Sequence, residues 1–386
     1  MKLLKILLLT LLSTNLIFAQ ESEIQKLASE NISTFNPTNK NTFIGNGWEK
    51  LLEVSKKSNS ILVGEEHFTN EIPYLINTLS SEIHFDNFIC EIDPFSAKTI
   101  ESKIENLNDK KLNDFLKNYG DNFSFFELKP EFELFQKFVK SKTNIIGLDQ
   151  ISLVADRLII SELKNQSKNE KAKSIYSSME ATSKKNSSDI YMFTDDFQNK
   201  LNELLALNLS AKETEQLMAL KLSREIYLES KHHLRIQWMK NQLIKELPNW
   251  KGKKNLFKFG AVHMPSGESL LEIYDIGNFV NNIEDSEFRK SLHILIIGKS
   301  GYSGTPDKSN PTQIIDENSA YLKIYKPFFN IAKDETWHLF DLQPFKKAIS
   351  ENKLSVENVM LSRVIKGYDY LIVVPRITPA KFIEPK

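Results

Sequence analysis

Six short apolar runs, several rich in β-branched residues, constrain what this chain can fold into. They occupy residues 60–67, 87–93, 143–149, 256–263, 292–298 and 368–375. Most of them are continuous rather than alternating, which is typical of strands buried on both faces of a parallel sheet. Helical patterns at 72–83, 132–140 and 153–163 separate the runs. This alternation predicts an α/β fold with a central, mainly parallel sheet flanked by helices.

Between about residues 160 and 250 the strand-like runs stop. The stretch 164–188 is polar and is compatible with either a solvated helix or a loop, whereas 196–247 has a strongly helical pattern. We therefore expect a helical insertion around 160–250 within a single domain that spans 21–386.

The first twenty residues have the layout of a secretory signal peptide. Lys2 and Lys5 precede an apolar core, and Ala19 supplies a small residue at the expected cut. The alternative is an uncleaved anchor, but Ser13 and the polar residues after it interrupt a run that is already short for a span of about 20 residues. We expect cleavage and export to the periplasm or the medium, with no membrane span afterwards.

Composition narrows the class of partner. The 386 residues carry 50 Lys+Arg and 50 Asp+Glu, a balance that argues against a binder of nucleic acid. The expected partner is a small-molecule substrate. Cys90 is the only cysteine in the sequence, so no internal disulfide can form.

Ionisable residues follow four of the predicted strands at the ends where they finish. The first strand ends in Glu65, Glu66 and His67, and the others end in Glu91 and Asp93, in Asp149 and in His263. Ligands of open α/β sheets bind beyond the carboxyl ends of the strands. Taken singly, Glu66 is best explained as structural or exposed, and Asp93 and Asp149 as helix caps. Taken together, His67, His263, Glu65 and Glu91 indicate a functional site.

Two kinds of chemistry suit this set of side chains. An imidazole with a pKa near neutrality can take a proton from water while a neighbouring carboxylate orients it, and a second histidine can support a developing oxyanion. The same residues can instead hold a divalent metal, because imidazole and carboxylate are its usual ligands. The residues alone leave both uses open.

Both histidines lie in the pattern Gly-x-x-His, "GEEH" at 64–67 and "GAVH" at 260–263. In these motifs the chain resembles the superfamily of erythromycin esterases, ChaN-like proteins and TraB/TIKI proteins. Gly64, Glu65 and His67 match its first motif, Glu91 its acidic residue after the second strand, and His263 its late histidine. "SREIYLES" at 223–230 resembles the arginine-bearing helix of the esterase branch. One residue separates Glu65 from His67, as in the ChaN-like and TIKI-like patterns, whereas the esterases usually have two.

The esterase branch implies hydrolysis of an ester, lactone or amide without a required cofactor. His67 would be the general base, Glu65 and Glu91 would orient it or hold the water, and His263 with Arg224 would stabilise the oxyanion. The proposed substrate-binding residues are Lys258, Asp149 and Glu71.

The other branches imply different uses of the same residues. The TIKI branch implies a peptidase with a divalent metal on His67, His263 and Glu91, and the ChaN branch implies binding of haem or iron. Arg224 and Lys258 favour hydrolysis, while Met264, directly after His263, is the feature that fits haem or a metal. Hydrolysis is the leading hypothesis.

Overall fold

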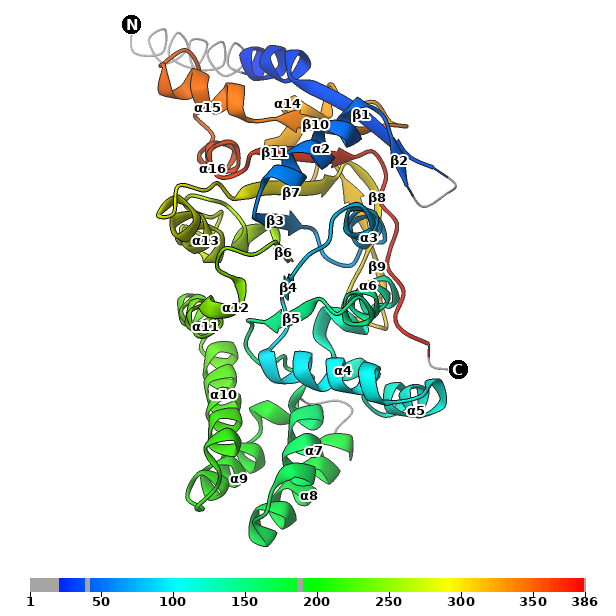
Figure 1. Cartoon of the computed structure of the whole chain (residues 1–386), viewed down its shortest axis with the longest axis vertical. Helices are drawn as coiled ribbons and strands as arrows, with labels where there is room; N and C mark the ends of the chain where they lie inside the picture. The colour runs from blue at the N-terminus through cyan, green and yellow to red at the C-terminus, as the bar shows by residue number, and fades with distance from the viewer. Residues whose placement is uncertain (1–20, 39–41, 186–189, 385–386) are drawn as a thin grey trace, which may run out of the picture. The chain divides into compact units, whose positions relative to one another are not determined.

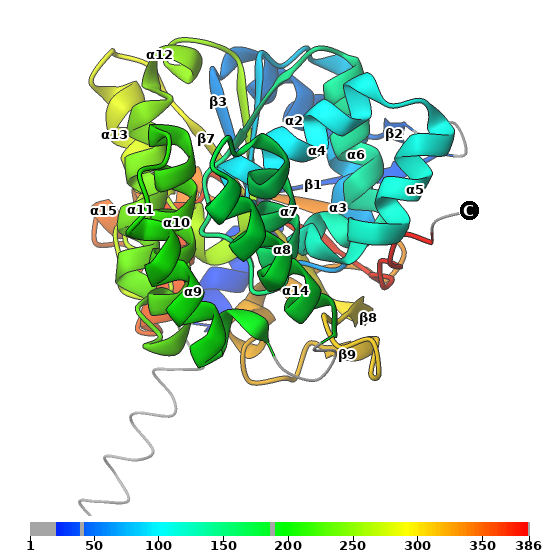
Figure 2. The same cartoon turned by 90° about the horizontal axis from the view of Figure 1, so that it is seen from below.

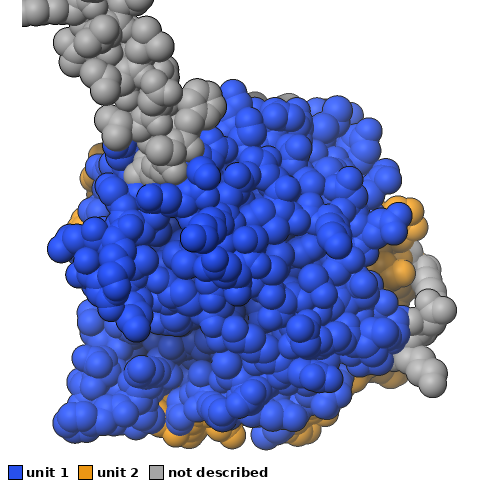
Figure 3. All heavy atoms as spheres, turned by 90° about the horizontal axis from the view of Figure 1, so that it is seen from above, with its two compact units in different colours: residues 1–84, 259–379 blue, residues 85–258, 380–386 orange. Residues whose placement is uncertain are grey.

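The computed structural model describes residues 21–38, 42–185 and 190–384. The predicted signal peptide, 1–20, lies outside the described residues. The stretch 21–386, predicted as a single domain, is divided into two units. Unit 1 comprises residues 1–84 and 259–379, and unit 2 comprises 85–258 and 380–386 (Figure 3).

Unit 1 contains six strands of the main sheet, in the order β2-β1-β10-β11-β7-β3 (Figure 1). Their bounds are β1 Ile32–Pro37, β2 Phe43–Ile44, β3 Ser60–Glu65, β7 Leu292–Gly298, β10 Trp337–Asp341 and β11 Tyr370–Val374. β3 and β11 both pair with β7 in parallel, whereas β10, β1 and β2 continue the sheet in antiparallel orientation. A hairpin of β8 (Ser300–Gly304) and β9 (Thr312–Asp316) follows β7.

The continuous apolar pattern of β3 matches its burial. Ile61, Leu62 and Val63 have no exposed surface, because both faces of this strand are covered. The register places Glu65 opposite Ile296 of β7, so the carboxyl ends of the two strands lie at the same edge. The ionisable residues that follow β3 are therefore delivered to that edge.

Unit 1 also contains helices. Their bounds are α2 Asn46–Lys57, α3 Glu71–Glu82, η4 Ala261–His263, α13 Ile276–Asp285, η5 Lys323–Tyr325, α14 Lys326–Phe329, α15 Gln343–Ser350 and α16 Val359–Gly367. At the β1–β2 edge, the rings of Phe35, Phe43, Trp48 and Trp337 pack together with centroid distances of 5.1–6.4 Å. These aromatic contacts fix the antiparallel end of the sheet.

Unit 2 contains three parallel strands in the order β6-β4-β5, with β4 at Asn87–Cys90, β5 at Asn144–Gly147 and β6 at Asn255–Gly260. The last two residues of β6 belong to unit 1. Each strand begins with an asparagine, and the three side chains form a ladder: Asn144 donates to Asn87 and Asn87 to Asn255, both at 2.8 Å. The ladder fixes the register of the three strands. Cys90, at the end of β4, is fully buried.

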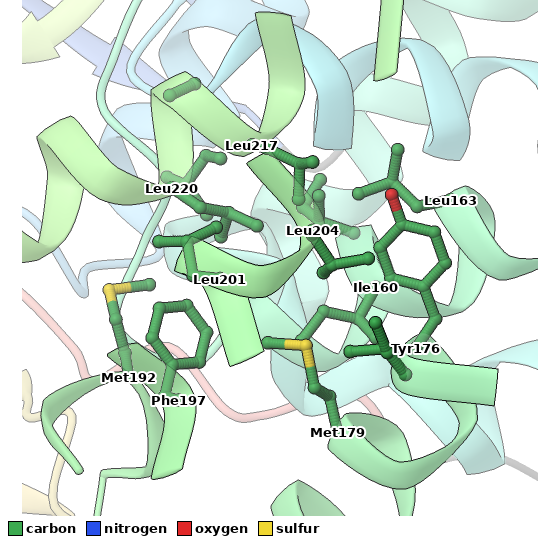
Figure 4. Packing of buried hydrophobic residues seen from close by; sticks show 14 of the residues in the cluster. Ile160, Leu163, Tyr176, Met179, Met192, Phe197, Leu201, Leu204, Leu217 and Leu220 are labelled. Carbon is green, nitrogen blue, oxygen red and sulfur yellow. The ribbon is translucent and has the colours of Figure 1, made fainter. Parts of the chain in front are cut away.

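Helices make up the rest of unit 2. Their bounds are α4 Pro94–Asn106, α5 Asp109–Tyr119, η1 Gly120–Asn122, η2 Ser124–Glu127, α6 Lys129–Lys140, α7 Asp156–Gln166, α8 Glu170–Lys185, η3 Tyr191–Phe193, α9 Asp195–Leu205, α10 Ala211–Leu228, α11 His232–Lys245 and α12 Leu247–Trp250. α7, α8, α9 and α10 lie side by side (Figures 1 and 2). Their apolar faces enclose a buried cluster that includes Ile160, Tyr176, Leu201 and Leu220 (Figure 4).

The α/β fold with a mostly parallel sheet flanked by helices is confirmed, and each of the six predicted runs contains a strand. The helical insertion is present as α7 to α12. Within it, the polar stretch left open between helix and loop contains α8. The long helical pattern is broken between α9 and α10 and again between α10 and α11. Among the described residues, no helix has both the length and the apolar character needed to cross a bilayer.

The helical cluster supplies a test of what stabilises unit 2. Leu201→Ala removes a fully buried side chain of α9 and should lower the free energy of unfolding by about 2–5 kcal/mol, because a cavity remains. Met218→Ala removes a side chain of α10 that is 50% exposed and should change it by less than about 0.5 kcal/mol. Urea denaturation measures both. Equal midpoints for the two variants would show that this cluster does not stabilise the fold.

Candidate functional site

In unit 1, the end of β3 brings Glu65 and His67 into direct contact. Their side chains are two residues apart and so leave the chain on the same side. His67 Nδ1 lies 2.9 Å from Glu65 Oε1, and the exposed fractions are 21% for the histidine and 3% for the glutamate. When Nδ1 donates to the carboxylate, the basic lone pair is on Nε2. The pair therefore has the geometry of an oriented general base.

The second histidine of the motif pattern, His263, lies at the end of η4 and is paired with Asp275. Nδ1 and Asp275 Oδ2 are 3.0 Å apart, and the side chains are only 2% and 1% exposed. Asp275 also caps α13, because its Oδ1 accepts from the backbone N–H of Ile276 at 2.6 Å. Asp275 was missed by the sequence analysis, although an aspartate directly before a helical run is a recognisable cap signal.

Glu66, between Glu65 and His67 in the sequence, contacts a neighbouring strand. Its carboxylate accepts from the backbone N–H of Gly298 at 3.0 Å, at the end of β7. Burial raises its pKa from 4.5 to about 7, against the lowering effect of that hydrogen bond. Of the two expectations for Glu66, structural or exposed, the contact with Gly298 fits the structural one.

In unit 2, Arg235 of α11 joins two of the predicted site carboxylates. It forms a fork with Asp149 through Nε–Oδ1 and Nη2–Oδ2 distances of 2.8 and 2.6 Å, and Nη2 lies 2.8 Å from Glu91 Oε1. Trp238, one turn later, donates to the Asp149 carbonyl at 2.9 Å. Burial lowers the pKa of Arg235, but Asp149 and Glu91 outweigh it and raise the pKa above its usual range. Glu91 and Asp149 are thus brought together, by an arginine that the sequence analysis did not select.

Arg224, the arginine that the resemblance selected, has other contacts. Its Nε and Nη2 donate to the carbonyls of Met192 and Phe193 at 3.0 and 3.4 Å. A break in the helical pattern separates Arg224 in α10 from the next arginine in α11, and Ser230 within this break has a φ of 52°. The arginine that contacts Glu91 is therefore Arg235 of α11. The role of Arg224 in stabilising an oxyanion stays a prediction.

Two predicted substrate-binding residues form pairs within their own units. In unit 2, Lys258 Nζ lies 2.8 Å from Glu131 Oε1, and both side chains are 4% exposed. In unit 1, the Glu71 carboxylate accepts from the backbone N–H and the hydroxyl of Thr378, at 2.9 and 2.6 Å. Glu71 thus anchors the segment that contains Thr378. Substrate binding by Glu71 and by Lys258 stays a prediction.

No protein-family model matches the chain, and no curated protein sequence matches it. Similar solved structures exist. A Bacillus cereus protein aligns over 94% of this chain and 99% of its own, with a TM-score of 0.55 and 13% identity. A succinoglycan biosynthesis protein aligns over 95% and 99%, with a TM-score of 0.54 and 14% identity.

A mutant of erythromycin esterase EreC in its open conformation aligns over 87% of this chain and 95% of its own, with a TM-score of 0.54 and 12% identity. ChaN of Campylobacter jejuni aligns at a TM-score of 0.30, too low to support an argument. At these identities the likenesses show the fold alone.

The Glu66 environment predicts a pH dependence of stability. Its pKa is about 7 in the folded chain and near 4.5 when solvated, so its contribution is fully present below about pH 4.5 and is lost as the pH rises through 7. The loss amounts to at most about 3 kcal/mol. Glu66→Gln keeps the acceptor for Gly298 and should flatten the free energy of unfolding between pH 5 and 8. The exposed Glu82→Gln should keep the wild-type slope, and an unchanged slope in Glu66→Gln would contradict the assignment.

Removing the Arg235 guanidinium should destabilise unit 2. Arg235→Ala takes away the bidentate partner of Asp149, whose side chain is 9% exposed, and should lower the free energy of unfolding by about 3–5 kcal/mol. Arg235→Lys keeps the charge but not the fork and should lose less. Urea titrations measure both variants. An Arg235→Ala chain as stable as wild type would show that the pair contributes nothing.

Proposed function

We propose that this chain, which has an erythromycin-esterase-like fold, is a hydrolase that cleaves an ester, lactone or amide with water activated by His67. The single observation that carries the proposal is the contact between His67 Nδ1 and Glu65 Oε1 at the end of β3. It fixes a tautomer in which Nε2 accepts a proton. The fold likeness supports the proposal, because one solved structure of similar fold is named as an erythromycin esterase, EreC.

The chemical step follows from that geometry. A water molecule attacks the carbonyl carbon while its proton passes to His67 Nε2, and Glu65 stabilises the imidazolium that forms. The C–O or C–N bond then breaks as the imidazolium returns the proton to the leaving oxygen or nitrogen. The products are a carboxylic acid and an alcohol or amine. General-base catalysis of this kind contributes about 10²–10⁴-fold in rate.

His263 and Asp275 supply the second part of the proposal. The Asp275 carboxylate holds the imidazole through Nδ1, which leaves Nε2 as the nitrogen that faces away from the aspartate. In the imidazolium form of His263, the proton on Nε2 would stabilise the oxyanion of the tetrahedral intermediate. The role implied for Glu91, which is to hold or orient water, needs a carboxylate that is fixed in place. The contact with Arg235 Nη2 supports this role.

We further propose that this step requires neither a metal ion nor haem. The fit of haem to Met264 is poor, because Met264 has no exposed surface and its carbonyl accepts from His293 Nδ1 at 2.6 Å. We also propose that residues 1–20 direct export, so that the substrate is met in the periplasm or the medium.

The test is turnover of a panel of chromogenic esters, lactones and amides by the purified chain. His67→Ala should lower kcat at least about 100-fold, because the general base is lost. Glu65→Gln should lower kcat while keeping the histidine, because the tautomer is no longer fixed. The exposed His84→Ala is the matched control and should behave as wild type. Dialysis against a chelator should leave the rate unchanged.

Two outcomes would reject the proposal. Turnover that persists in His67→Ala would remove the general-base role. Absence of turnover on the whole panel, together with metal or haem bound at one equivalent, would favour a binding protein or a metal-dependent peptidase instead.

A further inference from the structure

Residues 367–369, at the turn from α16 to β11 in unit 1, form a corner of the chain. Two of them are hydrogen-bonded to the two ends of the segment that carries His263. Tyr368 Oη donates to the carbonyl of Ala261 at the start of the segment. At its other end, Ser266 donates to the carbonyl of Gly367 through its backbone N–H at 2.8 Å and its hydroxyl at 3.0 Å. Residues 261–266 are therefore fixed by two adjacent residues, 367 and 368.

The middle of the same segment is fixed from β7. His293 Nδ1 lies 2.6 Å from the carbonyl of Met264, and its Nε2 lies 2.7 Å from Ser291 Oγ. Burial lowers the pKa of His293, so the ring stays neutral and can donate from Nδ1 to the carbonyl. The backbone N–H of His293 donates to Asp369, the residue after Tyr368, at 2.9 Å. The corner 367–369 thus supports the segment of His263 at its start, at its end and, through His293, in its middle.

The Tyr368 hydroxyl also lies against the other histidine motif. A Cβ added to Gly64 would clash with Tyr368 Oη and would lie 3.1 Å from the Cα of Ala261. Glycine at this position lets the two segments approach each other, because no other residue leaves that space open. The same hydroxyl therefore contacts the residue that opens the first Gly-x-x-His motif and binds the residue that follows the glycine of the second.

The chemical state of this hydroxyl is constant. Tyr368 has no exposed surface, and burial raises its pKa well above the usual range. It therefore remains protonated over the whole working range of pH and acts as a donor to the Ala261 carbonyl. Without that donor, a buried carbonyl would lose its hydrogen bond, and the end of β3 would lose the group against which Gly64 packs.

We propose that Tyr368 is a positioning residue that sets the placement of His67 relative to His263 through its contacts with Gly64 and Ala261. This inference rests on the proposed function, in which the first histidine activates water and the second stabilises the oxyanion. Both groups must address the same carbonyl, and small misplacements of catalytic groups are costly in rate. Tyr368 itself touches no reacting atom.

The test replaces one hydroxyl. Tyr368→Phe removes the donor but keeps the ring in place, and Tyr370→Phe, two residues later in β11, is the matched control. Tyr370 is also buried, at 6% exposure, but its ring faces Lys50 and not the histidine segments. Kinetics on the best substrate of the panel, urea denaturation, and NMR signals of the His67 and His263 imidazoles are measured for wild type and both variants.

The expected result has three parts. Tyr368→Phe lowers kcat about 10- to 100-fold with KM within about twofold, because binding is kept and alignment is lost. Its imidazole signals shift for both His67 and His263. Tyr370→Phe changes neither kcat nor the imidazole signals, even if it lowers the urea midpoint as much as Tyr368→Phe does.

Other results would overturn the proposal. If Tyr368→Phe leaves both imidazole signals in place, or shifts that of His263 alone, the hydroxyl does not couple the two motifs. If kcat falls equally in both variants, the effect is one of stability. Should the wild-type chain turn over no substrate, the proposed function fails, and the imidazole signals still decide whether Tyr368 positions the histidines.

Discussion

The cost of taking an ionised group out of water governs how this chain places its polar side chains. Such a group pays several kcal/mol in desolvation unless an opposite charge and hydrogen bonds compensate it. Within unit 1, the nearly buried His263 has Asp275, and within unit 2, Lys258 has Glu131 and Asp149 has Arg235. Groups that are chemically versatile in solution thus become fixed in direction, which is what a reactive centre requires.

Hydrophobic pattern was sufficient for the strands that pair in parallel within each unit. These are β3, β7 and β11 in unit 1 and β4, β5 and most of β6 in unit 2. Their runs consist mainly of buried apolar residues. β1 and β2 were not predicted because they lie at the antiparallel end of the sheet, where exposed and buried positions mix along a strand. β10 reads "WHLFD", in which His338 breaks the apolar run although it is buried. A run of five residues that is interrupted in this way is too short to stand out.

The candidate site was predictable to the extent that it depends on spacing along the chain. Glu65 and His67 meet because they are two residues apart on one strand end, a relation visible in the sequence. Asp275 lies twelve positions after the His263 that it contacts, and Arg235 lies on α11, 144 positions after Glu91. Neither relation leaves a local signal. The burial of Glu66 likewise comes from segments more than two hundred residues away, such as the end of β7.

The lone thiol of Cys90 closes β4 in the interior of unit 2, and its surroundings give it a further meaning. With no exposed surface and with its pKa raised by burial, it neither ionises nor meets a partner while unit 2 is folded. An oxidising compartment can therefore neither cross-link two copies nor couple the thiol to glutathione unless the strand opens. The rate at which Cys90 is alkylated would therefore report how often the parallel strands of unit 2 open, without any engineered label.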